Sequence, residues 1–360
     1  MAAAFPPPPV VAPLAETVGR ELRAQYERDG VVMIRQAVTL GQIAGLKVAL
    51  EEVFSRGDTA HQGGRTNMST AAAEAAADRG TVLLHDSAED AGAPSGEYLT
   101  ETNTGRWHHG VRRFEHESDL PAVIGGLVGT KTLRFFGDHC FLKEPNSSLQ
   151  TAFHQDMPYF SWTGDQAGVC WVPVDTVTKE SGAMRYVKGS HRWEQFAPRL
   201  LYSNEAVDDA AADYSPILPS DEEIYEQHEV LSWDCEPGDI IVHHPNMVHG
   251  SGGNTTAGQR RLAASIRYVG DDVRWDMKPT AVGLLTGDLG GKWHSASDGS
   301  SSMSLFAKAK ESFAELSADE LYQVAPTLAS LEMKDGNAFD ATESSRLAFP
   351  VVWGGDAARL

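Results

Sequence analysis

The sequence predicts a mainly β fold, a sandwich or barrel of short strands with α-helices at its flanks. From residue 132 onward, short β-like runs alternate with Gly, Pro and Asn punctuation, which is typical of an all-β core. Before residue 60, apolar residues recur at helical spacing instead. The chain of 360 residues is 41% hydrophobic, which is enough for one large β domain with helical additions or for two ordinary domains. We predict a single domain.

Two helices and a short strand are predicted at the start of the chain. The first helix stops at Asp29-Gly30, and residues 31–34 then read as a strand. Thr39 is expected to cap the second helix, which ends at Gly57. The apolar positions that define the helices are Leu14, Val18, Leu22 and Tyr26 in the first and Ile43, Leu46, Leu50 and Phe54 in the second. Both helices are expected to buttress the β core.

Residues 57–118 lack aliphatic periodicity, and we expect mostly loops there. They contain an Ala-rich run at 71–77 and then an aromatic and basic cluster, namely Trp107, His108, His109, Arg112 and Arg113. Clustered charge most often marks a solvated loop face, which is the interpretation that we favour. The alternative is a lid that contacts an acidic substrate, because binding residues are common on loops.

The β core and the tail complete the chain. The predicted core strands are 132–136, 168–174, 184–187, 240–243 and 262–269. The tail is mixed, with a helix at 318–324 and an apolar stop at 349–352. We therefore divide the domain into a helical buttress with loops (1–130), the β core (131–270) and a C-terminal extension (271–360). No internal repeat is visible.

Three residues form the set that is most informative about function. In 151–156, read as a strand, a period of two places His154 and Asp156 on the same face and turns Gln155 away. His249 follows the predicted strand 240–242, at a separation that suits a later strand of the same barrel. Two imidazoles and one carboxylate are the protein half of a facial triad, which leaves three cis positions on Fe(II) for a cosubstrate and O2. We therefore predict an iron site formed by His154, Asp156 and His249.

Other histidines compete with this assignment. The chain has 13 histidines, and a lone histidine is usually a surface or hydrogen-bonded core residue. His191, His243 and His244 lie near the predicted ligands in sequence. His244 is the best rival, but it precedes Pro245 rather than the Gly-Ser-Gly loop that follows His249.

An arginine pair opens the last core strand, and the pattern of that strand favours Arg260 as the buried member. Arg260 shares its face with Leu262, Ala264, Ile266 and Tyr268, whereas Arg261 shares the other face with Ala263, Ser265 and Arg267. Because the first face is more apolar, we assign it to the interior. A buried Arg260 would need an anion, and its planar fork suits a carboxylate.

Several motifs together resemble the phytanoyl-CoA dioxygenase family. They are His154-Gln155-Asp156 with Pro158-Tyr159-Phe160, then Cys170-Trp171, Ser181-Gly182-Ala183-Met184, Lys188-Gly189-Ser190-His191, and His249-Gly250-Ser251-Gly252 through Asn254 to Arg260. They agree with the family in order and spacing. The resemblance runs from about Thr132 to Val269 and is weaker in the N-terminal helical region.

The resemblance implies a non-haem Fe(II)- and 2-oxoglutarate-dependent dioxygenase on a double-stranded β-helix, the jelly-roll fold shared with cupins. By this resemblance, His154, Asp156 and His249 match the iron ligands, and Arg260 matches the arginine that holds the distal carboxylate of 2-oxoglutarate. Ser251 and Trp171 match residues that line the cosubstrate site, although turn chemistry and core packing would also explain them. The resemblance also implies that the strand face bearing Asp138, Cys140 and Leu142 lines the pocket. A packed core would produce the same alternation of side chains along the strand.

The same resemblance implies a reaction. Consumption of 2-oxoglutarate and O2, with release of succinate and CO2, is expected to hydroxylate an unactivated C–H bond of a small organic molecule. Desaturation, oxidative cyclisation and endoperoxide formation stay open as alternatives. Halogenation is disfavoured, because halogenating relatives lack the carboxylate ligand that Asp156 provides. A non-redox cupin metalloprotein or a non-catalytic binding module is the alternative of a different class, and loss of a ligand or of the arginine would favour it.

Composition limits the partners and the compartment. The formal net charge of −20 disfavours nucleic acid and anionic membranes, so the expected partner is a small molecule. The three scattered cysteines predict reduced interior residues rather than disulfides or a zinc site. We see no targeting signal and no apolar stretch long enough for a membrane span, and we expect a cytoplasmic protein. The sequence does not indicate an oligomeric state.

Overall fold

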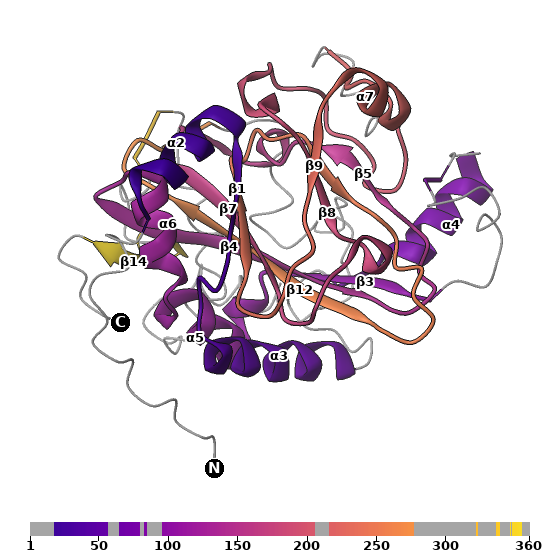
Figure 1. Cartoon of the computed structure of the whole chain (residues 1–360), viewed down its shortest axis with the longest axis horizontal. Helices are drawn as coiled ribbons and strands as arrows, with labels where there is room; N and C mark the ends of the chain where they lie inside the picture. Colours follow the sequence, from indigo (N-terminus) through magenta and orange to yellow (C-terminus); the bar gives the residue numbers. More distant parts are fainter. Residues whose placement is uncertain are drawn as a thin grey trace, which may run out of the picture.

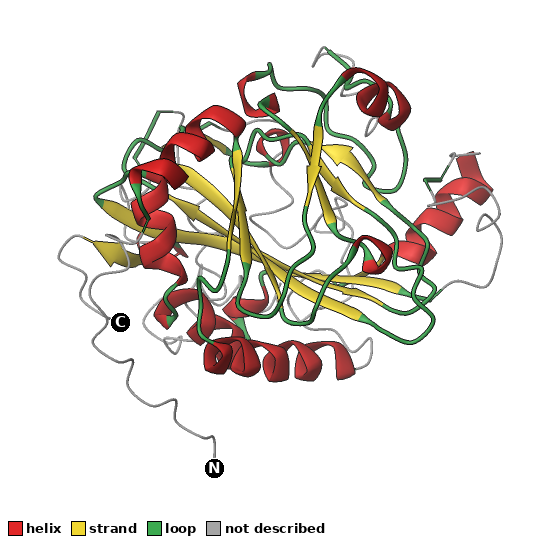
Figure 2. Cartoon of the chain, viewed as in Figure 1, coloured by secondary structure: helices red, strands yellow, loops and turns green. Residues whose placement is uncertain are grey.

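The structure of the chain is a computed structural model that describes residues 18–56, 65–79, 83–84, 96–205, 216–276, 322, 336–338, 346 and 348–354. Its strands form a large and a small antiparallel sheet, and helices cover the outer side of the large sheet (Figure 1, Figure 2). The predicted mainly β fold with flanking helices is confirmed. No helix in the described part of the chain is long and apolar enough to cross a membrane.

The large sheet has the strand order β1-β10-β7-β12-β4-β3-β2, and β14 pairs with β4. Its strands are β1 (Val31–Ile34), β2 (Thr66–Asn67), β3 (Tyr98–Thr102), β4 (Thr132–Lys143), β7 (Ala167–Pro173), β10 (Ile240–His243), β12 (Arg261–Val269) and β14 (Val351–Gly354). The small sheet, β5-β11-β8-β9, contains β5 (Thr151–His154), β8 (Met184–Val187), β9 (Val230–Ser232) and β11 (His249–Ser251). A further pair joins β6 (Trp162–Thr163) to β13 (Arg274–Trp275). Every predicted core strand is present.

The helices are α2 (Arg20–Asp29), α3 (Leu40–Ser55), α4 (Met68–Arg79), α5 (His109–Glu117), α6 (Leu120–Val128) and α7 (Asp221–Gln227). The described residues also contain the 3-10 turns η1 (Thr104–Arg106), η2 (Met157–Tyr159), η3 (Lys179–Ser181) and η4 (Ser190–Arg192). Of these helices, α2, α3, α5 and α6 contribute to one apolar core with the outer face of the large sheet. The predicted role of the two N-terminal helices as a buttress is therefore confirmed.

Local sequence explains where α2 ends and where α3 begins. Gly30 follows α2 with a left-handed φ of 78°, and a Cβ at this position would lie 2.3 Å from Nδ1 of His191. Glycine is therefore required there. At the start of α3, the hydroxyl of Thr39 accepts from the backbone N–H of Gln42, and the Gln42 side chain accepts from the backbone N–H of Thr39. This capping box confirms Thr39 as the predicted cap.

Strand β12 is buried on both faces, and the two faces have different partners. Leu262, Ala264, Ile266 and Tyr268 pack into the core beneath the helices. Arg261, Ser265 and Arg267 point in the opposite direction and line a pocket between the two sheets. The more apolar face is thus the outer, helix-covered one. The same holds for β4, where Cys140 and Leu142 face the helices while His139 and Phe141 face the pocket.

The described part of residues 57–118 is not mostly loops, which corrects the prediction from sequence for those residues. This part contains β2, α4, β3, η1 and α5. The Ala-rich run lies within α4, in keeping with the high helix propensity of alanine. Strand β3 pairs with β4 over five residues and so continues the large sheet. At the C-terminal end, Phe349 is buried and β14 extends from the predicted apolar stop, whereas the helix expected at 318–324 lies outside the described residues except for Tyr322.

Candidate active site

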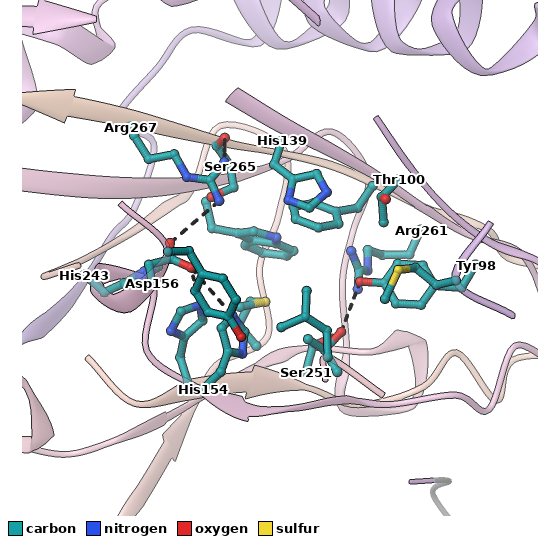
Figure 3. A pocket seen from close by; sticks show the side chains of 18 residues that line it. Tyr98, Thr100, His139, His154, Asp156, His243, Ser251, Arg261, Ser265 and Arg267 are labelled. Atoms are coloured by element: carbon teal, nitrogen blue, oxygen red, sulfur yellow. Dashed lines mark hydrogen bonds and ion pairs between the residues drawn. The ribbon is translucent and has the colours of Figure 1, made fainter. Parts of the chain in front are cut away.

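A pocket lies between the inner faces of the two sheets and has an empty volume of about 800 Å³, its open mouth included (Figure 3). The large sheet contributes Tyr98, Thr100, His139, Phe141, Trp171, His243, Arg261, Ser265 and Arg267. The small sheet contributes Thr151, His154, Met184, His249 and Ser251, and the remaining wall consists of Met68, Asp156, Tyr159 and Leu201. A mostly apolar pocket with a few convergent polar groups is the usual form of a small-molecule site.

The three predicted metal ligands converge in this pocket. In the register of the small sheet, His249 of β11 lies opposite His154 of β5, so the two imidazoles are neighbours with ring centroids 4.3 Å apart. Oδ1 of Asp156 lies 3.6 Å from Nε2 of His154 and 3.9 Å from Nε2 of His249. These side chains offer one ligand atom each, all within 4.8 Å of one another, and all three residues are buried. They therefore form one compact donor set.

Backbone hydrogen bonds orient both imidazoles toward the centre of this set. Nδ1 of His154 donates to the carbonyl of Ala152, and Nδ1 of His249 donates to the carbonyl of Met247, each at 2.9 Å. A carbonyl can only accept, so the proton resides on Nδ1 and the lone pair on Nε2. Burial and the neighbouring His154 lower the pKa of His249 to about 4. The neutral, metal-binding form of His249 is therefore favoured at neutral pH.

Asp156 is held as a carboxylate next to these histidines. The backbone N–H of Asp156 donates to the carbonyl of Pro245, a residue that follows β10. This hydrogen bond fixes the start of η2. Burial by itself raises the pKa of Asp156, but the charge of the Arg267 guanidinium, together with the neighbouring imidazoles, outweighs it and holds the pKa below its usual range. Gln155 points away, as predicted, with its amide donating to the carbonyls of Glu194 and Asn246.

The donor set fits Fe(II), whereas the rival histidines lie apart from it. Two imidazole nitrogens and one carboxylate oxygen, presented from one side, match the facial triad of non-haem iron sites. His244 accepts from the backbone of Asn246 and faces His191, outside the pocket. His243 does line the pocket, with its ring centroid 4.3 Å from that of His249, but it does not belong to the donor cluster found among the described residues.

The structure corrects the prediction that Arg260 is the buried arginine. Arg260 precedes β12, its side chain is 45% exposed, and it pairs with Glu51 of α3 at 2.6 Å. Arg261 is instead 1% exposed and lines the pocket. The prediction took the more apolar face of the strand for the one that faces the site. That face packs against the helices, and the face toward the site is the more polar one.

Arg261 is a buried cation without an anionic partner among the described residues. Its guanidinium lies 5.8 Å from the ring centroid of Trp171, and its Nε has no hydrogen-bond acceptor among the described residues. Burial lowers the pKa of Arg261, and Tyr98 partly counters this shift. A buried guanidinium is costly unless an anion compensates it. The pocket is thus prepared for a negatively charged group at this end.

Ser251 and Trp171 both line the pocket, as the resemblance implied. Ser251 belongs to a chain of polar contacts: Nζ of the buried Lys143 donates to the Ser251 hydroxyl, which donates to Thr151, and the hydroxyl of Tyr98 contacts Thr151 as well. Lys143 lies opposite Arg261 in the β4–β12 register. Sequence reasoning missed Tyr98 and Lys143. The alternation of His139, Phe141 and Lys143 along β4 was the available signal for the lysine.

The aromatic and basic cluster at 107–113 does not line the pocket, which speaks against the alternative of a substrate-contacting lid. His108 caps α5 by accepting from the backbone N–H of Val111, and its Nε2 contacts Glu52 of α3. Trp107 lies under the guanidinium of Arg56. The cluster therefore joins α5 to α3. Trp107, His108 and Arg112 are thus held by packing and hydrogen bonds, whereas His109 and Arg113 are exposed.

Arg112 and Arg113 provide a test of this structural role. Nε and Nη2 of Arg112 donate to the carbonyls of Gly105 and Arg106, whereas Arg113 is exposed. We expect Arg112→Ala to lower the free energy of unfolding by about 1–3 kcal/mol through the loss of these hydrogen bonds. Arg113→Ala should change it by no more than about 0.5 kcal/mol. Denaturant melts measure both, and an unchanged Arg112→Ala protein would refute this role.

The profile of a family described as Phytanoyl-CoA dioxygenase (PhyH) matches residues 26–262. A probable phytanoyl-CoA dioxygenase of Caenorhabditis elegans is 29% identical over 167 residues, which cover 42% of this chain and 48% of the nematode protein. The peroxisomal phytanoyl-CoA dioxygenase of Rattus norvegicus is 23% identical over 271 residues, 71% of this chain and 69% of the rat protein. The chain thus aligns with about half of the nematode relative.

A solved structure gives the same fold. The epimerase SnoN, in complex with Fe3+, alpha ketoglutarate and nogalamycin RO, has a TM-score of 0.52 at 22% identity, with 75% of this chain and 90% of that chain covered. At this identity the likeness concerns the fold alone. It confirms the predicted cupin-like jelly roll, the double-stranded β-helix, for the chain.

Proposed function

The chain belongs to the phytanoyl-CoA dioxygenase (PhyH) family, and from this premise we propose that it is a non-haem Fe(II)- and 2-oxoglutarate-dependent dioxygenase acting on a small organic molecule. The observation that carries the proposal is the combination of two features in one pocket. One is the buried donor set of His154, Asp156 and His249, and the other is the buried guanidinium of Arg261, which has no anionic partner among the described residues. A metal site alone would not require a buried arginine that lacks an anion.

Each of these residues would have a role in binding iron or 2-oxoglutarate. The two imidazoles and the Asp156 carboxylate would hold Fe(II), leaving sites for the keto acid end of 2-oxoglutarate and for O2. Arg261 would bind the distal carboxylate of 2-oxoglutarate through its planar fork, in place of the predicted Arg260. Trp171 would form a wall of the cosubstrate site, and Ser251 would contribute its hydroxyl there. These assignments rest on position in the pocket and on the family resemblance.

When bound, iron and 2-oxoglutarate supply the oxidising chemistry. The balanced reaction joins 2-oxoglutarate, O2 and a substrate C–H bond and gives succinate, CO2 and an alcohol. The protein would hold the substrate carbon near the metal in a pocket from which water is excluded, because small displacements there cost large rate factors. Desaturation, cyclisation or endoperoxide formation is the alternative outcome of the same site. Asp156 occupies the place that a halogenating enzyme would leave to chloride.

The charge balance of the pocket supports an acidic substrate. Among the described residues that line the pocket, Asp156 is the only carboxylate, Arg261 and Arg267 are the only arginines, and no lysine is present. The negative charge of Asp156 balances that of one arginine, and the two negative charges of 2-oxoglutarate balance those of Fe(II). The positive charge of the second arginine is then left unbalanced. A carboxylate-bearing substrate would neutralise it. A carboxylic acid should therefore stimulate 2-oxoglutarate turnover more than its primary amide in a substrate screen.

We further propose a single catalytic domain and a cytoplasmic location. A single catalytic domain over residues 1–360 is supported by one pocket formed jointly from both sheets. A cytoplasmic location is supported by the three cysteines, Cys140, Cys170 and Cys235, which are all free and buried. A non-redox cupin is the competing class, and it offers no reason for a buried Arg261 that has no anionic partner among the described residues.

The proposal is tested by O2-dependent formation of succinate. Protein stripped of metal and reloaded with Fe(II) should convert 2-oxoglutarate to succinate in the presence of ascorbate. Protein reloaded with Zn(II) should bind the metal but give no succinate, because zinc has no redox chemistry. Succinate formation at the same rate by the zinc form, or metal binding by the iron form without any turnover, would exclude the proposed activity.

A further inference from the structure

The two oxygens of Asp156 have different partners. Oδ1 faces the Nε2 atoms of His154 and His249, whereas Oδ2 lies 3.6 Å from Nη2 of Arg267 (Figure 3). Oδ2 is buried and accepts no hydrogen bond from a neutral donor in the described residues. The Arg267 ion pair is therefore the interaction that distinguishes the two oxygens.

Arg267 is itself held in place by the fold. Its side chain is 8% exposed, and Nη1 donates to the carbonyl of Ser265 on the same strand. The guanidinium also lies 5.8 Å from the ring centroid of Phe160, which follows η2 shortly after Asp156. Asp156 is the only carboxylate among the described residues with which Arg267 forms an ion pair. The arginine therefore faces Asp156 from a fixed position on β12.

The two pocket arginines cannot exchange roles. Arg261 and Arg267 lie on the same face of β12 but six residues apart, which separates their backbones by about 20 Å at the usual rise of a strand. Arg261 is near Trp171 and Tyr98, at the far end of the pocket from Asp156 (Figure 3). One arginine thus serves the distal end of the pocket and the other serves the donor set.

We propose that Arg267 is a positioning residue that restrains Asp156 to bind the metal through one oxygen. A carboxylate can bind a metal with one or both oxygens. If both oxygens of Asp156 bound, the carboxylate would take a further position of the octahedron, and fewer than three would remain for 2-oxoglutarate and O2. An ion pair at Oδ2 opposes that second contact. This inference rests on the proposed metal site, and it adds a requirement that the donor set alone does not impose.

Cobalt(II) binding to the full-length protein tests the proposal without any turnover. A second contact by Asp156 would displace a bound water at an unchanged coordination number, so the ligand-field spectrum of Co(II) reports it as a change in the position and shape of the bands. In Arg267→Met we expect a changed ligand-field band and a Kd for Co(II) about tenfold higher, as is typical when the partner of a metal ligand is removed. Removal of a cation alone would have the opposite effect on the Kd, because it would relieve repulsion of the metal. The sign of the change therefore separates positioning from charge.

Two further variants complete the experiment. Arg267→Lys should fall between wild type and Arg267→Met, since an ammonium supplies the charge but lacks the planar fork that reaches both Ser265 and Asp156. Arg106→Met removes another buried arginine, one that donates to the carbonyl of Phe136 and is absent from the pocket wall. It should leave the Co(II) spectrum and Kd unchanged even if it lowers the melting temperature.

The outcomes are distinguishable. An unaltered Co(II) spectrum in Arg267→Met, or tighter Co(II) binding in that variant, would overturn the positioning role. So would an equal spectral change in Arg106→Met, because the effect would then be general to buried arginines. Failure of the proposed metal site would have another signature: wild-type protein would not bind Co(II), or His154→Ala would bind it as tightly.

Discussion

Arg261→Ala is expected to raise the Kd for 2-oxoglutarate at least about a hundredfold. The guanidinium would donate two charge-assisted hydrogen bonds to the distal carboxylate, each contributing roughly 1.5–3 kcal/mol, and every 1.4 kcal/mol or so is a factor of ten. Because Arg261 has no anionic partner within the described protein, its truncation leaves no buried acid uncompensated. The variant should therefore remain folded. Anaerobic titration of the Fe(II)-loaded protein with 2-oxoglutarate measures the effect.

Arg260→Ala is the matched control, since it removes the same side chain one residue earlier. Its ion pair with Glu51 is largely exposed to solvent, and such pairs contribute about 0–1 kcal/mol to stability. We expect the Kd for 2-oxoglutarate to change less than about twofold in this variant. A large defect in Arg260→Ala together with near-normal binding by Arg261→Ala would show that the strand register of β12 is wrong and would restore the assignment made from sequence.

The metal ligands could be predicted from sequence because their geometry is local. His154 and Asp156 are two residues apart, and His249 carries its own turn motif, Gly250-Ser251-Gly252. The two-residue period of a strand places His154 and Asp156 side by side whatever the rest of the fold is. The sequence could not show that β5 and β11 are neighbours, which places the third ligand opposite the first. Only the family resemblance supplied that contact.

The arginine could not be assigned by the same reasoning, because β12 is buried on both faces. Hydrophobic alternation identifies the core face of a strand only when the other face meets solvent. On β12 the helix-covered face is apolar, and the pocket face carries Arg261 and Arg267. The rule therefore selected the wrong side. Polar residues on a buried strand are better explained by a site than by solvent, and this also applies to His139 on β4.

The segment 57–118 was mispredicted for a different reason. Its helices are short, and their side chains find partners far away in sequence, as His108 does in Glu52. Isolated short helices are marginal in water, so their stability comes from packing that no local pattern reveals. Strand β3 depends in the same way on pairing with β4. The position of Tyr98 in the pocket followed from that pairing and could not be predicted without it.

The largest effect on metal binding is expected from His154→Ala. Loss of one of three protein ligands should raise the Kd for Fe(II) or Co(II) by more than the roughly 10–100-fold that follows from removing a group that only orients a ligand. His243→Ala is the control, because it removes another buried imidazole from the same pocket. His243 is neutral at neutral pH, since burial and the nearby His249 lower its pKa, and neither of its ring nitrogens has a hydrogen-bond partner among the described residues.

We expect His243→Ala to change the metal Kd by less than about tenfold, below the range for groups that orient ligands. Equilibrium dialysis with Co(II) measures both variants, and thermal melts of the metal-free proteins check that each is folded. Because both substitutions leave a similar cavity, a difference between them reports ligation rather than packing. Equal loss of metal in the two variants would make His243 a ligand and would replace the facial triad with a four-residue site. Retention of metal by His154→Ala would remove the central ligand of the proposed enzyme.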